Sequence, residues 1–147
     1  MTARAHEGEE LPVLELTPGL GQVIRFCALS WNFPPAFYDA EAAKAAGMPG
    51  TLVPGPLKLG LLYRTVDAWL GGRGFVRHVR AAHRRPDVSG RPITIHGTVA
   101  RVYEEDGHQR ADIELVVANM NGEASVRGFA TVQFQYTVNA SDREAGN

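Results

Sequence analysis

Residues 55–72 read GPLKLGLLYRTVDAWLGG, and this run predicts a long, mostly buried helix over residues 56–70. Proline at the first helical position costs no hydrogen bond, because that N–H has no partner inside the helix. Gly71 and Gly72 favour the left-handed turn that ends helices. Gly60 costs about 1 kcal/mol relative to alanine, so we expect it to pack closely against another backbone. One wide helical face carries the apolar residues Leu57, Leu59, Leu61, Leu62, Val66, Trp69 and Leu70.

After the helix the apolar period changes to two, which predicts antiparallel strands. Residues 104–107 and 121–122 are turn sequences that close hairpins, and Asn-Gly at 121–122 is the stronger signal. The predicted strands follow one another as a meander and cover residues 75–88, 93–103, 111–117 and 126–136.

The region before the helix predicts two further elements. Residues 23–29 are rich in good strand formers and predict a first strand. Residues 40–46 predict a short helix, because alanine is the best helix former, Asp39 can cap the first turn and Gly47 can end the last. Pro-Gly pairs in residues 48–55 predict a loop.

Together these elements predict an α+β fold, in which an antiparallel sheet of about five strands wraps around one central helix. The length of 147 residues fits a single domain over residues 1–147. The polar ends, residues 1–10 and 139–147, are expected to be flexible.

Composition excludes several kinds of partner. The formal net charge is −1, so we expect neither nucleic acid nor an anionic membrane as a partner. The apolar run over residues 57–70 is interrupted by charges and is too short to span a bilayer. A single cysteine, Cys27, and a polar N-terminus unlike a signal peptide predict a cytoplasmic protein. His78, His83 and His96 show no metal-ligand spacing, so no metal site is expected, although His83 could reach a pocket.

Three segments carry a family resemblance. Residues 26–39 read FCALSWNFPPAFYD and residues 47–57 read GMPGTLVPGPL, while N-x-x-G and G-x-A-x-V spacings recur within residues 119–132. These segments resemble the MaoC-like hydratase and dehydratase family over most of the chain. The resemblance implies a hot-dog fold and a hydro-lyase reaction, in which water is added or removed at the 2,3 bond of an acyl-CoA or acyl-carrier thioester.

The resemblance also implies roles for individual residues. Asn32 matches the family position that orients or activates water, and the Gly55 N–H matches the donor that polarises the thioester carbonyl. No separate cofactor is implied, since CoA or pantetheine is part of the substrate. The expected substrate-binding residues are Trp31, Phe37, Pro54 and Leu57.

Each role has a structural alternative. Asn32 can hydrogen-bond its own backbone, Gly55 can be a turn glycine, and Phe37 can be core filler. Phe37 and Pro34 stand where the family's related branch carries histidines, and phenylalanine cannot exchange a proton. The basic residues Arg77, Arg80, Arg84 and Arg85 form either a solvated face or a contact for the phosphates of CoA or a pantetheine arm.

Three functions therefore stay open. The chain is an enoyl-thioester hydratase with substituted residues, a non-catalytic subunit whose homologous partner supplies the histidine, or a pocket repurposed as a cyclase or another small-molecule enzyme. We expect a homodimer or a heteromer with another hot-dog chain, because pairing covers an open sheet edge and an apolar flank.

Overall fold

The computed structural model describes residues 5–135. Its elements in chain order are β1 (Leu14–Leu16), α1 (Leu20–Ser30), the 3₁₀ helix η1 (Pro35–Phe37), α2 (Ala40–Ala45), α3 (Gly55–Leu70), β2 (Gly74–His83), β3 (Ile93–Glu105), β4 (His108–Asn119) and β5 (Ala124–Phe134). No helix among the described residues is long and apolar enough to cross a membrane.

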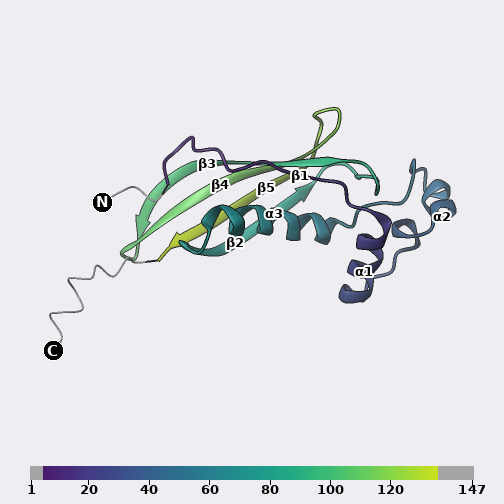
Figure 1. Ribbon diagram of the computed structural model, residues 1–147, viewed down its shortest axis with the longest axis horizontal. Coiled ribbons are helices and arrows are strands. Elements are labelled where there is room, and N and C mark those ends of the chain that lie inside the picture. The colour runs from purple at the N-terminus through teal and green to yellow at the C-terminus, as the bar shows by residue number, and fades with distance from the viewer. Residues whose placement is uncertain (1–4, 136–147) are drawn as a thin grey trace.

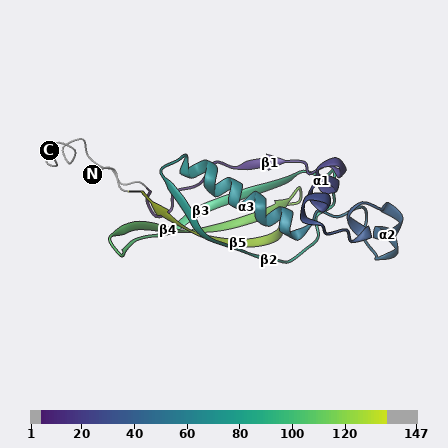
Figure 2. The ribbon, with the colours of Figure 1, turned by 90° about the horizontal axis from the view of Figure 1, so that it is seen from below.

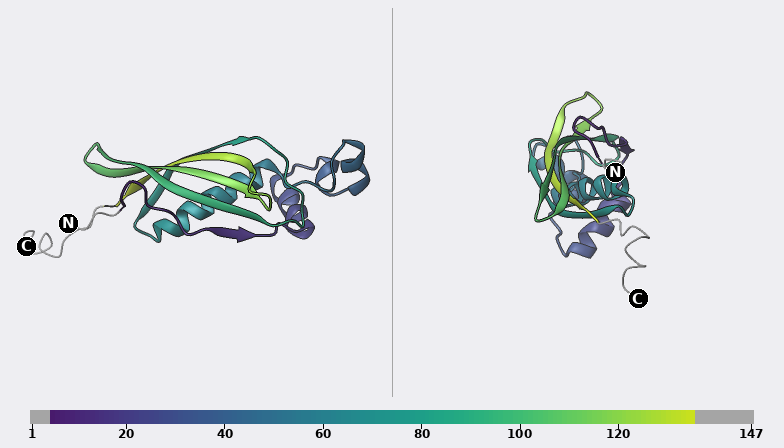
Figure 3. Two further views of the ribbon diagram at one scale, coloured as in Figure 1. Left: turned by 90° about the horizontal axis from the view of Figure 1, so that it is seen from above. Right: turned by 90° about the vertical axis from the view of Figure 1, so that its left-hand side faces the viewer.

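The five strands form one antiparallel sheet, in the order β1-β3-β4-β5-β2. The sheet curls around α3, which lies along its concave face (Figure 1, Figure 3). This arrangement confirms the predicted α+β class with an antiparallel sheet around a central helix.

The predicted meander is wrong for β2. This strand pairs with β5 at one edge of the sheet, and the loop after it carries the chain across to β3. Apolar alternation shows which face of a strand is buried but not which strand lies beside it, so periodicity could not reveal this order.

The core lies between α3 and the sheet. Leu62 and Val66 are fully buried there. The helix and the sheet pack tightly at Gly128 of β5, where an added β-carbon would lie 2.6 Å from Leu62 Cδ1. The close packing predicted at Gly60 is wrong, because this glycine is exposed and an added β-carbon would meet nothing within 4 Å. Leu59, predicted on the buried face, is only half-buried.

The strand predicted over residues 23–29 is wrong, because these residues are part of helix α1. Val23 and Cys27 lie one helical turn apart and are fully buried, whereas Ile24 and Leu29 are exposed. Burial at this spacing favours a helix, and tertiary packing overrides the strand preference of individual residues.

The N-terminal segment differs from the expected flexible end. The Gly8 N–H donates to the Val99 carbonyl at 2.8 Å, and the Leu11 N–H donates to the Gly97 carbonyl at 2.9 Å. Ala5 and Leu11 are buried. Residues 5–10 therefore lie along β3, and β1, which the sequence pattern did not reveal, extends the same edge.

Several local predictions are confirmed. The Asp39 carboxylate caps α2 by accepting hydrogen bonds from the Glu41 and Ala42 N–H groups. Gly71 ends α3 with a φ of 55°. Hairpins turn at residues 104–107 and 121–122, as predicted. Residues 1–4 and 139–147, predicted to be flexible, and Tyr136, predicted at the end of the last strand, lie outside the described part of the chain.

Candidate functional site

The residues singled out by the sequence gather at the end of the sheet where α3 begins. Figure 2 shows α1 and α2 at this end, beyond the N-terminus of α3. A small apolar cluster joins the elements: Val23 and Cys27 of α1 pack with Val53 and Leu57, and Phe37 packs against them. The predicted substrate-binding residues Phe37 and Leu57 are thus brought together.

Gly55 is the first residue of α3, and Pro54 before it is buried. Within residues 5–135 the Gly55 N–H has no hydrogen-bond acceptor, and no side chain caps this helix end. Pro56 has no N–H to offer. Gly55 as a whole is half-buried. The N-terminus of a helix carries a partial positive charge, so the Gly55 N–H is a donor suited to a developing oxyanion.

The His83 imidazole lies directly against Gly55. A β-carbon added to Gly55 would lie 3.1 Å from both Cε1 and Nε2 of this ring, so any larger residue at position 55 would press on the imidazole. Partial burial of the ring and, second, the charge of Lys58 hold the pKa of His83 below its usual value. The imidazole therefore favours its neutral form.

A buried ion pair stabilises the region where His83 meets Gly55. Lys58 Nζ lies 2.9 Å from the Asp87 carboxylate, and both side chains are only 3% exposed. The ammonium also donates to the Arg85 carbonyl at 3.2 Å. The Val53 N–H donates to the Asp87 carbonyl at 2.8 Å. These bonds fasten the loop after β2 to the start of α3, and therefore fix His83 relative to Gly55.

Asn32 lies just beyond α1 and is exposed. Its N–H donates to the Cys27 carbonyl at 3.0 Å and helps to end the helix. Its side-chain amide has no hydrogen-bond partner in the described part of the chain, so the alternative of a bond to its own backbone is not what the structure shows. The amide is available to water or substrate.

Trp31 stands apart from the apolar cluster. Its side chain is 83% exposed and meets the Phe33 ring edge-on, with centroids 5.3 Å apart. Its φ of 50° is left-handed, which is uncommon for a residue other than glycine. Pro34, which the resemblance aligns with a family histidine, is also exposed.

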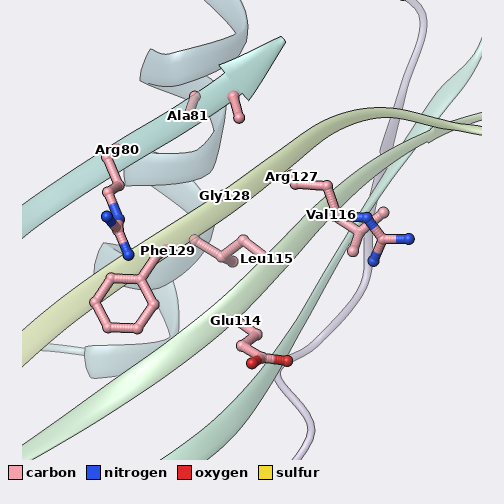
Figure 4. A pocket seen from close by; sticks show the side chains of 9 residues that line it. Arg80, Ala81, Glu114, Leu115, Val116, Arg127, Gly128 and Phe129 are labelled. Carbon is pink, nitrogen blue, oxygen red and sulfur yellow. The ribbon is translucent and has the colours of Figure 1, made fainter. Parts of the chain in front are cut away.

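A separate hollow of about 430 Å³ lies on the face of the sheet away from α3. Figure 4 shows Arg80, Phe129 and Glu114 there, and the Arg80 guanidinium lies 4.8 Å from the centre of the Phe129 ring. None of the predicted catalytic or substrate-binding residues lines this hollow, although Arg80, one of the basic residues considered as a phosphate contact, does. Among residues 5–135, no group of three or more His, Cys, Asp or Glu side chains could hold a metal ion.

Sequence reasoning missed the Lys58–Asp87 pair and did not select His83 as a site residue. One signal for the pair was present, because Lys58 sits between Leu57 and Leu59 on a helix predicted to be largely buried. A charged residue in such a place needs a partner. Nothing in the sequence pattern pointed from Lys58 to Asp87.

No protein-family model and no curated protein matches the sequence. Solved structures do. The (R)-hydratase of A. caviae involved in PHA biosynthesis superposes with a TM-score of 0.83 and 21% identity, over 91% of this chain and 100% of that chain. The ChsH1–ChsH2 complex of Mycobacterium tuberculosis gives 0.80 and 21%, over 92% and 100%. The MaoC-like dehydratase of Rhodospirillum rubrum gives 0.79 and 14%, over 93% and 98%.

At these identities the likeness establishes the fold. A five-stranded antiparallel sheet curls around one central helix in this chain, and the superposition covers nearly all of each relative. The chain has the hot-dog fold of MaoC-like dehydratases and (R)-hydratases.

Proposed function

We propose that the chain binds acyl thioesters of CoA or of a carrier protein and adds or removes water at their 2,3 bond. The observation that carries the proposal is the Gly55 N–H, which stands without an acceptor in residues 5–135 at the start of α3. A thioester oxygen bound there would accept this hydrogen bond, and the helix N-terminus would favour the negative charge that develops on it.

The surrounding residues suit the rest of such a substrate. Phe37 and Leu57 offer an apolar surface for the acyl chain next to this donor. The free amide of Asn32 can orient the water that is added. The CoA or pantetheine group belongs to the substrate, so the proposal requires no separate cofactor.

A second candidate is a subunit of a heteromeric assembly. One face of α1 and the residue after it is apolar and exposed, with Leu20 at 42%, Ile24 at 47% and Trp31 at 83%. Exposed apolar faces of this kind typically meet a protein partner. The ChsH1–ChsH2 structure is a complex, and a second hot-dog chain is the partner that this reading requires.

The first test uses the purified full chain alone. Calorimetry with butyryl-CoA, which cannot be hydrated, measures thioester binding, and loss of enoyl absorbance measures hydration of crotonyl-CoA. Native mass spectrometry gives the oligomeric state in the same buffer. Binding with turnover supports the hydratase proposal. Turnover only after addition of a second hot-dog chain that carries the family histidine supports the subunit proposal. A chain that neither binds butyryl-CoA nor turns over crotonyl-CoA contradicts the thioester proposal.

A further inference from the structure

The proposed reaction needs a group that moves a proton, and Phe37 and Pro34 cannot do so. We propose that His83, at the end of β2, is the proton-transfer residue of this site. The inference rests on the proposed function and assigns the proton transfer to the sheet instead of to the segment after α1.

The position of the ring supports this assignment. His83 pairs with Val126 of β5, which is fully buried, and paired residues of an antiparallel sheet project to the same face. The His83 side chain therefore points toward α3, where its ring meets Gly55. The two groups that the reaction needs, a donor for the thioester oxygen and a base, are adjacent.

The ring is also free to act. In the described part of the chain neither nitrogen of His83 has a hydrogen-bond partner, and the side chain is exposed. His96 and His78, also in the sheet, do not lie against the start of α3 in this way. His96 contacts the Thr94 hydroxyl at 3.1 Å, and His78 lies five positions back on β2, opposite Thr131.

Burial and the charges around the ring favour its neutral form. On the face toward α3, β5 contributes Val126, which carries no charge, and α3 contributes Lys58. The loop after β2 contributes Asp87, which is already paired with Lys58. Partial burial of the ring is the main factor that opposes protonation of the imidazole, and the Lys58 ammonium opposes it further, so the pKa of His83 is lowered. A neutral imidazole is the form that can accept a proton.

The step balances as follows. The neutral His83 imidazole takes one proton from water as the water oxygen bonds to C3 of the enoyl thioester. The C2–C3 π electrons move toward the thioester carbonyl, whose oxygen accepts a hydrogen bond from the Gly55 N–H. The imidazolium then returns its proton to C2, which restores the carbonyl and completes the addition of one water. Dehydration runs through the same transfers in reverse.

The test compares His83→Gln with His78→Gln, a matched change on the same strand that leaves the Gly55 corner intact. In His83→Gln, kcat for crotonyl-CoA hydration should fall by about 10²–10⁴-fold. Its affinity for butyryl-CoA should stay within about threefold of wild type. His78→Gln should change neither quantity. A His83→Gln variant whose kcat stays within about threefold of wild type overturns the assignment.

A pH profile separates proton transfer from a structural effect. In the wild type kcat/KM should fall as pH falls through the lowered pKa of His83, and this acid limb should vanish in the residual activity of His83→Gln. An acid limb that persists unchanged in the variant overturns the assignment. If the wild type binds butyryl-CoA but shows no turnover, the assignment of His83 is overturned while thioester binding stands. If the wild type shows neither binding nor turnover, the proposed function itself is overturned.

Discussion

Replacing Asp87 with alanine leaves the ammonium of Lys58 buried without its counter-charge. The two side chains are 2.9 Å apart and each is 3% exposed, so water cannot readily replace the lost carboxylate. One hydrogen bond, to the Arg85 carbonyl, remains for the ammonium. Breaking a buried pair by removing one partner costs roughly 3–5 kcal/mol. Because a domain is stable by about 5–15 kcal/mol, Asp87→Ala should remove roughly a fifth or more of the free energy of unfolding.

The assay is urea unfolding followed by circular dichroism. Asp87→Ala should lower the midpoint strongly, and thermal scans should show a drop in Tm of roughly 6–20 °C. Arg85→Ala breaks an ion pair with Glu123 whose side chains are 56% and 44% exposed, and should change the midpoint much less.

A double variant tests whether the loss of stability in Asp87→Ala comes from an unpaired buried charge. Lys58→Met with Asp87→Leu removes both charges together, and buried pairs replaced in this way are often neutral or stabilising. The double variant should therefore be more stable than Asp87→Ala. A double variant that is no more stable than the single one, or a single loss below about 1 kcal/mol, would refute the description of Lys58–Asp87 as a desolvated pair.

Three further predictions concern the core, His83 and Phe37. Leu62→Ala should cost about 2–4 kcal/mol in urea unfolding, because Leu62 is fully buried under Gly128, and an unchanged midpoint would show that α3 is not the core. The pKa of His83 is lowered in the folded chain, so the unfolded chain binds the proton more readily; this contribution to stability is present above about pH 6.5 and is lost as pH falls through the lowered pKa. Acidification should thus destabilise wild type more than His83→Gln, and equal losses would contradict the shift. Phe37→His should raise crotonyl-CoA hydration, with Pro34→His added to it raising it further, and no gain in either variant would show that these positions do not reach the reacting atoms.

Much of the fold could be predicted because apolar residues recur regularly in each element. They recur at the helical period in α3 and at every second position in the later strands. Ile113 and Leu115 alternate with exposed or half-buried neighbours and so mark one face of β4. The segment before α3 gave no such repeat. Residues 23–29 contain strand-forming residues, but only Val23 and Cys27 among them are buried. The sequence does not show that these two are the buried residues, because they pack with Val53 and Leu57, which lie far along the chain.

The candidate site could be predicted only in part, because it joins residues that are distant in the chain. Asn32, Phe37, Pro54, Gly55 and Leu57 lie close enough in sequence for a motif to connect them. His83 reaches Gly55 only because β2 returns along α3 to its beginning. The sequence places His83 in a basic strand, and its neighbours there suggest nothing beyond a solvated surface.

Phe37 connects packing with chemistry. Phe37 packs against the apolar cluster of α1 and the start of α3, and so holds the segment after α1 against the start of α3. A histidine there would bring a polar ring into an apolar cluster, and a buried polar group without a partner costs roughly 1–3 kcal/mol. The phenylalanine therefore helps to hold the segment after α1 in place but supplies no acid–base group there. An imidazole on β2 escapes this conflict, since the side chain of His83 is exposed and its backbone is fixed by the ladder with β5. Under the proposed assignment, anchoring falls to Phe37 and proton transfer falls to His83, so no single residue has to do both.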